Sequence, residues 1–249
     1  MKREDINVLV ACEESQRVCT AFRALGFNAY SNDAIACSGG HPEWHILDNA
    51  LSVIGGGTMK LQNGNWITIP HWDMIIAHPP CTYLSNVSVR HHSLAMTPEN
   101  RIEGRTIERI NAMRFFMEMI RANSNHIAVE NPVGIMNTAF RKPDEIIEPY
   151  QFAAGTDDAD NYVTKRTCLW LKNLPPLQKN TLPRPDNAAM FGRLKSGKPK
   201  NFEENHAKLQ DWASFQSWAD DATARSKTFP GIAKAMAEQW GKYLMECME

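Results

Sequence analysis

The stretch INVLVACEESQRVCTAFRALGFNAYSND, residues 6–33, decides the fold that we expect for this chain. Its first part, INVLVAC (6–12), is an apolar, β-branched run of strand length. Its last part, NAYSND (28–33), predicts a second strand that ends on an acid. The residues between them predict a helix, so the chain opens as strand, helix, strand, which is typical of α/β folds.

The predicted helix between these strands has its own boundary signals. Ser15 is the predicted N-cap, and Gly26 is predicted to end the helix because glycine tolerates the left-handed conformation. Apolar residues recur at helical spacing at Val18, Phe22 and Leu25. One face of this helix is therefore expected to pack on the sheet.

Further apolar runs predict the rest of the sheet. The predicted strands are HIL (45–47), WDMIIAH (72–78), HIAVENP (126–132) and YVTKRTCLWL (162–171). MKLQNGNWITI (59–69) predicts a β-hairpin inserted between them, with Asn63 and Gly64 as a tight two-residue turn.

Longer helices are predicted further along the chain. One starts at Thr97 and runs to about residue 123, and two more cover about 204–222 and 230–246. The apolar stripe predicted for the first of these helices comprises Ile107, Ile110, Met113, Phe116, Met117 and Ile120.

The alternation of strands and helices predicts an α/β fold with a doubly wound, mostly parallel sheet. Residues 1–172 and 225–249 are expected to form the main domain. Residues 173–224 begin with a proline-rich run and continue into a basic one, which predicts a small loop-rich and helical appendage.

The composition narrows the class of protein. The chain has 249 residues and a net charge of −1, so any nucleic-acid partner would be held by local basic patches. Its six cysteines form no CxxC pair, and His41 and His45 have no obvious third ligand, so we expect no metal site. Without a secretory signal or an apolar stretch of membrane-spanning length, we expect a cytoplasmic protein with reduced thiols and no membrane partner.

Polar and nucleophilic side chains follow several of the predicted strands. These residues are Cys12, Glu13, Asp33, Asp48, Cys81 and Glu130. Ligands of doubly wound sheets bind beyond the carboxyl ends of the strands. The convergence of these residues from separate segments therefore predicts an active site at that edge.

Cys81 follows two prolines that restrict its loop and hold the thiol in place for nucleophilic attack. A buried structural cysteine is the alternative. Glu130 is either a functional carboxylate or a strand-end acid that caps a helix. Arg166 either pairs with Glu130 or with an anionic substrate, or it is a solvated strand-edge arginine.

Taken in this order, these residues resemble the motifs of the cytosine carbon-5 DNA methyltransferase family. Residues 79–81 match its Pro-Pro-Cys motif. Glu130 and Asn131 match its Glu-Asn motif, which usually continues with valine where this chain has Pro132. Arg166 matches the basic motif that follows.

The resemblance implies a Rossmann-like fold and S-adenosyl-L-methionine as the cofactor. ACEES (11–15) takes the place of the first cofactor loop without its usual glycines, and RSKTFPGIAKAMAEQW (225–240) resembles the last conserved block. The cofactor-binding residues implied by the resemblance are Ala11, Cys12, Glu13, Ser15, Asp33, Asp48 and Pro79.

The resemblance also implies a covalent mechanism. Cys81 would add to carbon 6 of a cytosine flipped out of DNA, and the methyl group would pass to carbon 5. Glu130 would hold and protonate the ring at N3, and Arg166 would steady the base and the developing charge. His78 before the prolines and Cys81 after them differ from the residues of enzymes that methylate exocyclic amines.

The expected partner is DNA. Residues 173–224 would form a short target-recognition segment beside the catalytic domain. The residues expected to contact phosphates are Arg90, Arg193, Lys195, Lys198 and Lys200. The short segment leaves open a free cytosine nucleotide or single-stranded nucleic acid as substrate, and the missing glycines leave open a catalytically inactive binding protein. A bacterial or phage-infected cell is the setting that the resemblance implies.

Overall fold

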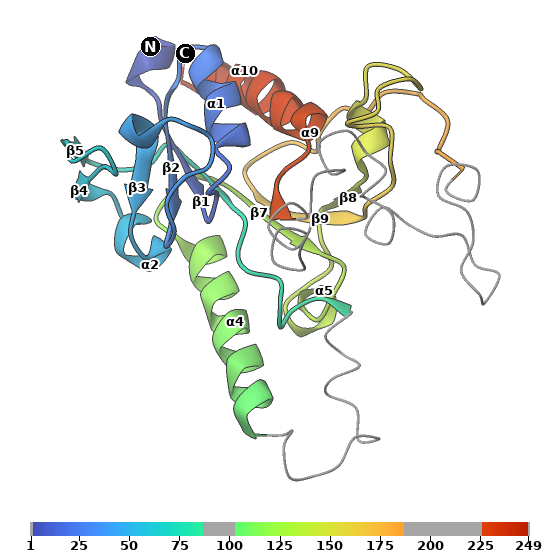
Figure 1. Cartoon of the computed structure of the whole chain (residues 1–249), viewed down its shortest axis with the longest axis horizontal. Helices are drawn as coiled ribbons and strands as arrows, with labels where there is room; N and C mark the ends of the chain where they lie inside the picture. Colours follow the sequence, from blue (N-terminus) through green and yellow to red (C-terminus); the bar gives the residue numbers. More distant parts are fainter. Residues whose placement is uncertain (1, 87–102, 187–225, 249) are drawn as a thin grey trace.

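A computed structural model describes residues 2–86, 103–186 and 226–248 and shows an α/β protein built on a mostly parallel sheet of seven strands (Figure 1). The strand order is β3-β2-β1-β6-β7-β9-β8. The strands are β1 (Asn7–Ala11), β2 (Asn28–Asp33), β3 (His45–Leu47), β6 (Met74–Ala77), β7 (His126–Pro132), β8 (Glu145–Ile147) and β9 (Thr167–Lys172). Only β9 runs antiparallel to its neighbours, β7 and β8, within this sheet.

Helices cover both faces of the sheet (Figure 1). The α-helices are α1 (Arg17–Ala24), α2 (Ala50–Val53), α4 (Glu103–Arg121), α5 (Met136–Ala139), α9 (Pro230–Ala235) and α10 (Gly241–Cys247), with a π-helical turn, η8 (Met236–Trp240), joining the last two. Short 3-10 helices cover η1 (Arg3–Asp5), η2 (Pro42–Trp44) and η5 (Pro149–Phe152).

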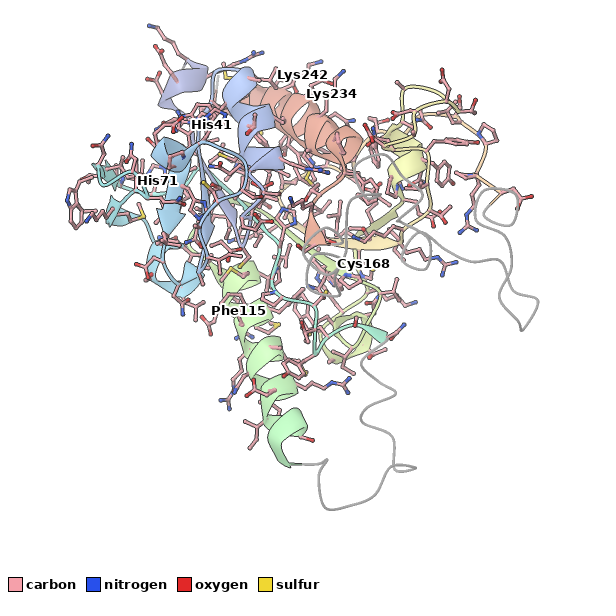
Figure 2. The ribbon with its side chains drawn as sticks, viewed as in Figure 1. His41, His71, Phe115, Cys168, Lys234 and Lys242 are labelled. Carbon is pink, nitrogen blue, oxygen red and sulfur yellow. The ribbon has the colours of Figure 1, made fainter. Side chains whose placement is uncertain are left out.

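Two apolar cores lie on opposite faces of the sheet. One packs α1 against the C-terminal helix, the continuous segment α9–η8–α10, with Phe22 and Trp240 fully buried. The other packs α2, α4 and the hairpin of residues 57–69 together, with Trp72 and Phe116 fully buried. The C-terminal helix also has an outer side, where Lys234 is exposed (Figure 2). This two-sided covering explains why the central strands are apolar throughout instead of alternating with polar residues.

The predicted strand-helix-strand opening is confirmed, but the start of α1 differs from the prediction. Ser15 is not the N-cap; that position is Gln16, whose left-handed backbone (φ 58°) begins the helix without a side-chain cap bond. The carboxylate of Glu13 takes over the capping role from five residues upstream. Gly26 ends the helix as predicted, with a φ of 89°.

The hairpin is confirmed, but its turn is longer than predicted. β4 (Gly57–Lys60) pairs with β5 (Trp66–Ile69), and the Leu61 amide donates to the Asn65 carbonyl across a three-residue loop. Within this loop only Gly64 has a positive φ, 95°. A two-residue turn of the predicted kind needs two such residues, and Asn63 does not supply the second.

Two further predictions are partly wrong. The strand predicted over 162–171 begins only at Thr167, because the chain before it turns at η5 and its following loop instead of pairing. The stripe predicted on α4 is buried only toward the C-terminal end of the helix: Phe116 and Ile120 are buried, whereas Ile107 and Ile110 are exposed. The helix predicted over 204–222 lies outside the described residues. No helix in the described ranges is long and apolar enough to cross a membrane.

Candidate active site

The carboxyl ends of the strands form one edge, and the predicted residues lie along it in sheet order. Across the sheet the edge carries Asp48 after β3, Asp33 at the end of β2, Cys12 after β1, Pro79 after β6, Glu130 near the end of β7 and Arg166 just before the reversed β9. The direction of winding reverses between β1 and β6. Ligands of such sheets bind outside the carboxyl ends at this reversal point.

Buried polar atoms without partners also gather at this edge. Among the residues that the structure describes, they are Glu14 Oε1, Asn32 Oδ1, His78 Nε2 and Asn131 Oδ1. They come from the ends of β1, β2, β6 and β7, which are adjacent strands. An unpaired buried polar atom is costly, so their clustering indicates a place where a ligand completes the hydrogen bonding.

The carboxylate of Glu13 fixes the loop after β1 against the start of α1. Glu13 is buried and accepts hydrogen bonds from the amides of Val18 (2.6 Å) and Cys19 (3.1 Å) at the start of α1. Burial raises the pKa of Glu13 to about 7, against the opposing effects of the nearby His78 and of the two amides. Glu13 therefore occupies the helix N-terminus, where an anionic ligand would otherwise bind.

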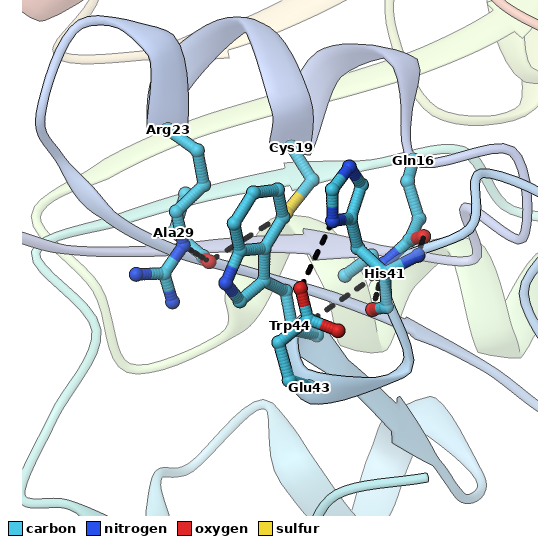
Figure 3. A network of polar contacts seen from close by, with 8 residues as sticks. Gln16, Cys19, Arg23, Ala29, His41, Glu43 and Trp44 are labelled. Atoms are coloured by element: carbon cyan, nitrogen blue, oxygen red, sulfur yellow. Dashed lines mark hydrogen bonds and ion pairs between the residues drawn. The ribbon is translucent and has the colours of Figure 1, made fainter. Parts of the chain in front are cut away.

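Gln16 fixes the segment that follows β2 (Figure 3). Its buried side chain donates to the carbonyl of His41 (2.8 Å) and to Ser31 Oγ (3.1 Å), and it accepts from the His41 amide (3.0 Å). The His41 ring stacks on Trp44 at 3.9 Å between ring centroids. These contacts hold the loop after Asp33 against the start of α1.

The two acids expected to bind the cofactor differ in their surroundings. Asp33 is partly buried, its Oδ1 accepts from the Ile35 amide (3.2 Å), and burial raises its pKa. Asp48 is exposed and accepts from the amide of Asn49 (2.6 Å). The two backbones meet directly, because the Asp48 amide donates to the Asp33 carbonyl (3.1 Å).

The turn that carries Cys81 is braced against the end of β7. Asn131 Nδ2 donates to the carbonyl of Pro79 (2.7 Å), which ties the proline pair to the neighbouring strand. The Cys81 carbonyl accepts from the amides of Leu84 and Ser85 (both 3.0 Å), which closes the turn. The Cys81 side chain itself is exposed.

A second brace lies beyond this turn, where the backbone of residues 84–86 meets that of 133–135. The Ile135 amide donates to the Leu84 carbonyl (2.8 Å). Gly134 sits so close that an added Cβ would lie 2.0 Å from the Leu84 carbonyl oxygen. Only glycine fits there, so the approach of the Cys81 turn to the segment after Glu130 depends on this residue.

His78 and Glu130 form a pair between β6 and β7. His78 Nδ1 lies 3.2 Å from Glu130 Oε2, and the two side chains are 8% and 24% exposed. Burial alone would lower the pKa of His78, but the hydrogen bond to Glu130 and the negative charges of Glu130 and Glu13 raise it above its ordinary value. The pairing with Glu130 therefore favours the protonated form of His78 at a position where burial alone would disfavour it.

Arg166 reaches the same edge because β9 runs backward. Thr167 pairs with Pro132 at the end of β7, so the preceding Arg166 lies beside the end of the strand that carries Glu130. Its side chain is exposed and makes no ion pair or hydrogen bond with the rest of the described chain. The structure therefore brings the segments of Cys81, Glu130 and Arg166 together on adjacent strands.

The predicted nucleic-acid contacts cannot be placed in the same way. Arg90, Arg193, Lys195, Lys198 and Lys200 all lie outside the described residues. Arg109, which the structure does describe, donates from Nε to the Tyr83 carbonyl (3.1 Å) beside the Cys81 turn.

The histidines of the HPEWH segment are both engaged internally. His45 contacts Ser31 Oγ (2.8 Å) and the Ile35 carbonyl (3.0 Å), and His41 contacts Glu43 (2.9 Å). No cluster of three metal-binding side chains occurs within residues 2–86, 103–186 and 226–248.

Sequence reasoning missed several residues of this edge. Glu14 and Asn32 are not among the predicted site residues, although they lie at the same strand ends as the predicted Glu13 and Asp33. His78 enters the sequence prediction only as the residue before the proline pair. A buried histidine directly after an apolar strand, opposite a strand-end acid, was the signal that could have identified it.

No protein-family model matches this chain, and no curated protein matches it either.

Proposed function

We propose that this protein is an S-adenosyl-L-methionine-dependent DNA methyltransferase that acts on carbon 5 of cytosine through Cys81. One observation carries the proposal: the turn with the exposed Cys81 thiol is held against the end of β7, the strand that bears Glu130. The turn of Cys81 is tied to Asn131 and to the segment around Gly134, directly after Glu130. Arg166 lies beside the same strand end. Nucleophile, proton donor and cation are the parts that covalent attack on a ring needs.

The first half of the edge suits the cofactor. S-adenosylmethionine carries a sulfonium and an ammonium group, ribose hydroxyls and an adenine, and it has no phosphate. The unpartnered acceptors Glu14 Oε1 and Asn32 Oδ1, next to Asp33, fit a ligand rich in donors and positive charge. Because Glu13 occupies the start of α1, a dinucleotide pyrophosphate has no amides left to bind there. This argues for a Rossmann-like methyltransferase and against a dehydrogenase.

The chain's own residues then divide the work on the base. The Cys81 thiolate adds to carbon 6 of cytosine, and Glu130 gives a proton to N3 as electrons move into the ring. S-adenosylmethionine, when bound, supplies the methyl group that carbon 5 accepts. Loss of the carbon-5 proton to solvent, return of the N3 proton to Glu130 and expulsion of the Cys81 thiolate restore the aromatic ring. Arg166 stabilises the charge that develops on the base.

A transfer assay tests this proposal. The protein is incubated with S-adenosylmethionine labelled in its methyl group and with duplex DNA, single-stranded DNA or dCMP in separate reactions. We expect labelled 5-methylcytosine in DNA. Transfer to dCMP alone would move the substrate to free nucleotides, and cofactor binding without transfer to any substrate would contradict the enzymatic proposal.

Two cysteine variants control this assay. Cys81→Ala should abolish transfer, because Cys12, another thiol at this edge, is partly buried and burial raises its pKa to about 12. Cys247→Ala removes another exposed thiol, at the end of α10, and should leave transfer unchanged. Equal activity of the two variants would sink the assignment of Cys81 as nucleophile.

A further inference from the structure

The buried pair of His78 and Glu130 has features that a structural ion pair does not require. His78 Nδ1 is used by Glu130 at 3.2 Å, whereas its Nε2 is buried and has no hydrogen-bond partner. Buried polar atoms of purely structural residues are normally hydrogen-bonded, so the unpaired Nε2 at this edge of the sheet indicates a further role for His78.

The charged groups around His78 come from three directions. Glu130 lies on β7, Glu13 lies in the loop after β1, and Lys165 precedes β9. The two acids favour the imidazolium form, and Lys165 opposes it. The imidazole thus contacts the carboxylate of Glu130 and also feels the charge of Glu13, the carboxylate that caps α1.

We propose that His78 is a positioning residue that shares one proton with Glu130 and restores it after each transfer to a substrate ring. This inference rests on the proposed function for its last step. The residue is distinct from the cysteine and the acid that would touch the base, because it acts only through Glu130.

The proton balance is simple. In the resting pair the imidazolium donates its Nδ1 proton to the Glu130 carboxylate. When the base binds, the Nδ1 proton moves onto Glu130 and Glu130 passes its proton to the ring nitrogen, which leaves a neutral imidazole and an ionised Glu130. When the ring nitrogen loses its proton at the end of the cycle, the proton returns to the pair. No oxidant, reductant or additional reactant is needed.

Side-chain NMR tests the shared proton without any substrate. The eight histidines are labelled with ¹⁵N and titrated, and the spectrum of His78→Gln assigns the His78 signals. We expect His78 to titrate above an exposed histidine in the wild-type protein and markedly lower in Glu130→Gln. A His78 titration that is unchanged by Glu130→Gln would overturn the inference.

Rate measurements test the role in turnover. His78→Gln keeps a hydrogen-bonding side chain but holds no titrating proton. We expect its transfer rate at pH 7 to fall about tenfold, less than the roughly 10²–10⁴-fold cost of losing a direct proton donor, and its pH–rate profile to lose the limb set by the pair. An unchanged profile would overturn the inference.

A second buried histidine provides the matched control. His45 is fully buried and contacts Ser31 and the Ile35 carbonyl, away from Glu130. His45→Gln should lower stability but keep the shape of the wild-type pH–rate profile. If the wild-type protein binds S-adenosylmethionine but transfers no methyl group, the proposed function fails, and the turnover role of His78 fails with it. The NMR result would then show separately whether the shared proton exists.

Discussion

Cys12 and Cys81 follow the two strands, β1 and β6, between which the winding of the sheet reverses, yet their surroundings differ. Cys12 is partly buried with a φ of 59°, and burial together with the charge of Asp33 raises its pKa to about 12. Cys81 is exposed on a turn braced by Asn131. Position at a strand end therefore does not by itself make a thiol reactive. The surrounding loop determines how exposed the thiol is and how burial shifts its pKa.

The same contrast extends to the two halves of the edge. We call the half around β1 the closed half, because internal contacts fill it: Glu13 caps α1 and Gln16 holds the loop after β2. We call the half around β6 and β7 the open half, because it presents the exposed Cys81 thiol and the His78–Glu130 pair. We interpret the first as a shaped receptor for a cofactor and the second as the place of chemistry.

The largest expected effect is in thiol labelling. A thiol with a pKa of about 12 is only roughly 10⁻⁴ ionised at pH 8, so Cys12 should react with iodoacetamide about 10³-fold more slowly than Cys81. Peptide mass spectrometry at timed intervals measures both rates in one sample. Comparable rates at the two positions would remove the contrast from which the assignment of Cys81 starts.

The second effect concerns the closed half and its pH dependence. The pKa of Glu13 rises from 4.5 to about 7 on folding, so the folded state binds the proton more tightly. The stability that this provides is present below pH 4.5 and is lost as the pH rises through 7. Relative to Glu13→Gln, the wild-type free energy of unfolding should fall by about 3 kcal/mol between pH 4.5 and 8.

Urea denaturation of both proteins across this pH range checks the prediction. The comparison removes the contributions of the other titrating groups, because both proteins contain them. A difference that stays constant with pH would mean that folding does not shift the pKa of Glu13 and would contradict this prediction.

The smallest expected effect concerns the brace of the open half. In Gly134→Ala the new Cβ would lie 2.0 Å from the Leu84 carbonyl oxygen, so the backbone must move. We expect a loss of about 1–3 kcal/mol in the free energy of unfolding and a changed labelling rate at Cys81 but not at Cys12. Gly55→Ala is the matched control, since nothing lies within 4 Å of its added Cβ. Equal behaviour of the two variants would show that the brace does not position the thiol.

The sequence predicts the strands that are buried on both faces, and it fails where the outcome depends on a distant partner. β7 matches its predicted range and β6 lies within its predicted range, because apolar runs between polar loops leave little choice. The start of β9 was wrong, since a polar segment can extend a strand or turn away from it with equal local preference. Its reversed direction follows from tertiary packing alone.

The candidate site shows the same division. Strand-end positions are enough to bring Cys81 and Glu130 to one edge, because the carboxyl ends of parallel strands meet there. Arg166 reaches this edge only because β9 runs antiparallel to β7, which the sequence does not predict. The use of Glu13 as a cap and the pairing of His78 with Glu130 were not predictable in this way. The His78–Glu130 pair joins two separate segments, and the Glu13 cap depends on the left-handed turn at Gln16 within one segment. No spacing in the sequence encodes either side-chain direction.

The most direct measurement of the central claim is a trapping experiment. A cytosine oligonucleotide with fluorine at carbon 5 is incubated with the protein and S-adenosylmethionine, because the fluorine prevents the final elimination. Mass spectrometry of the digested protein should then find the oligonucleotide, with its added methyl group, covalently bound to Cys81 and absent from Cys81→Ala. An adduct on Cys12, or none at all from a protein that binds the cofactor, would contradict the account.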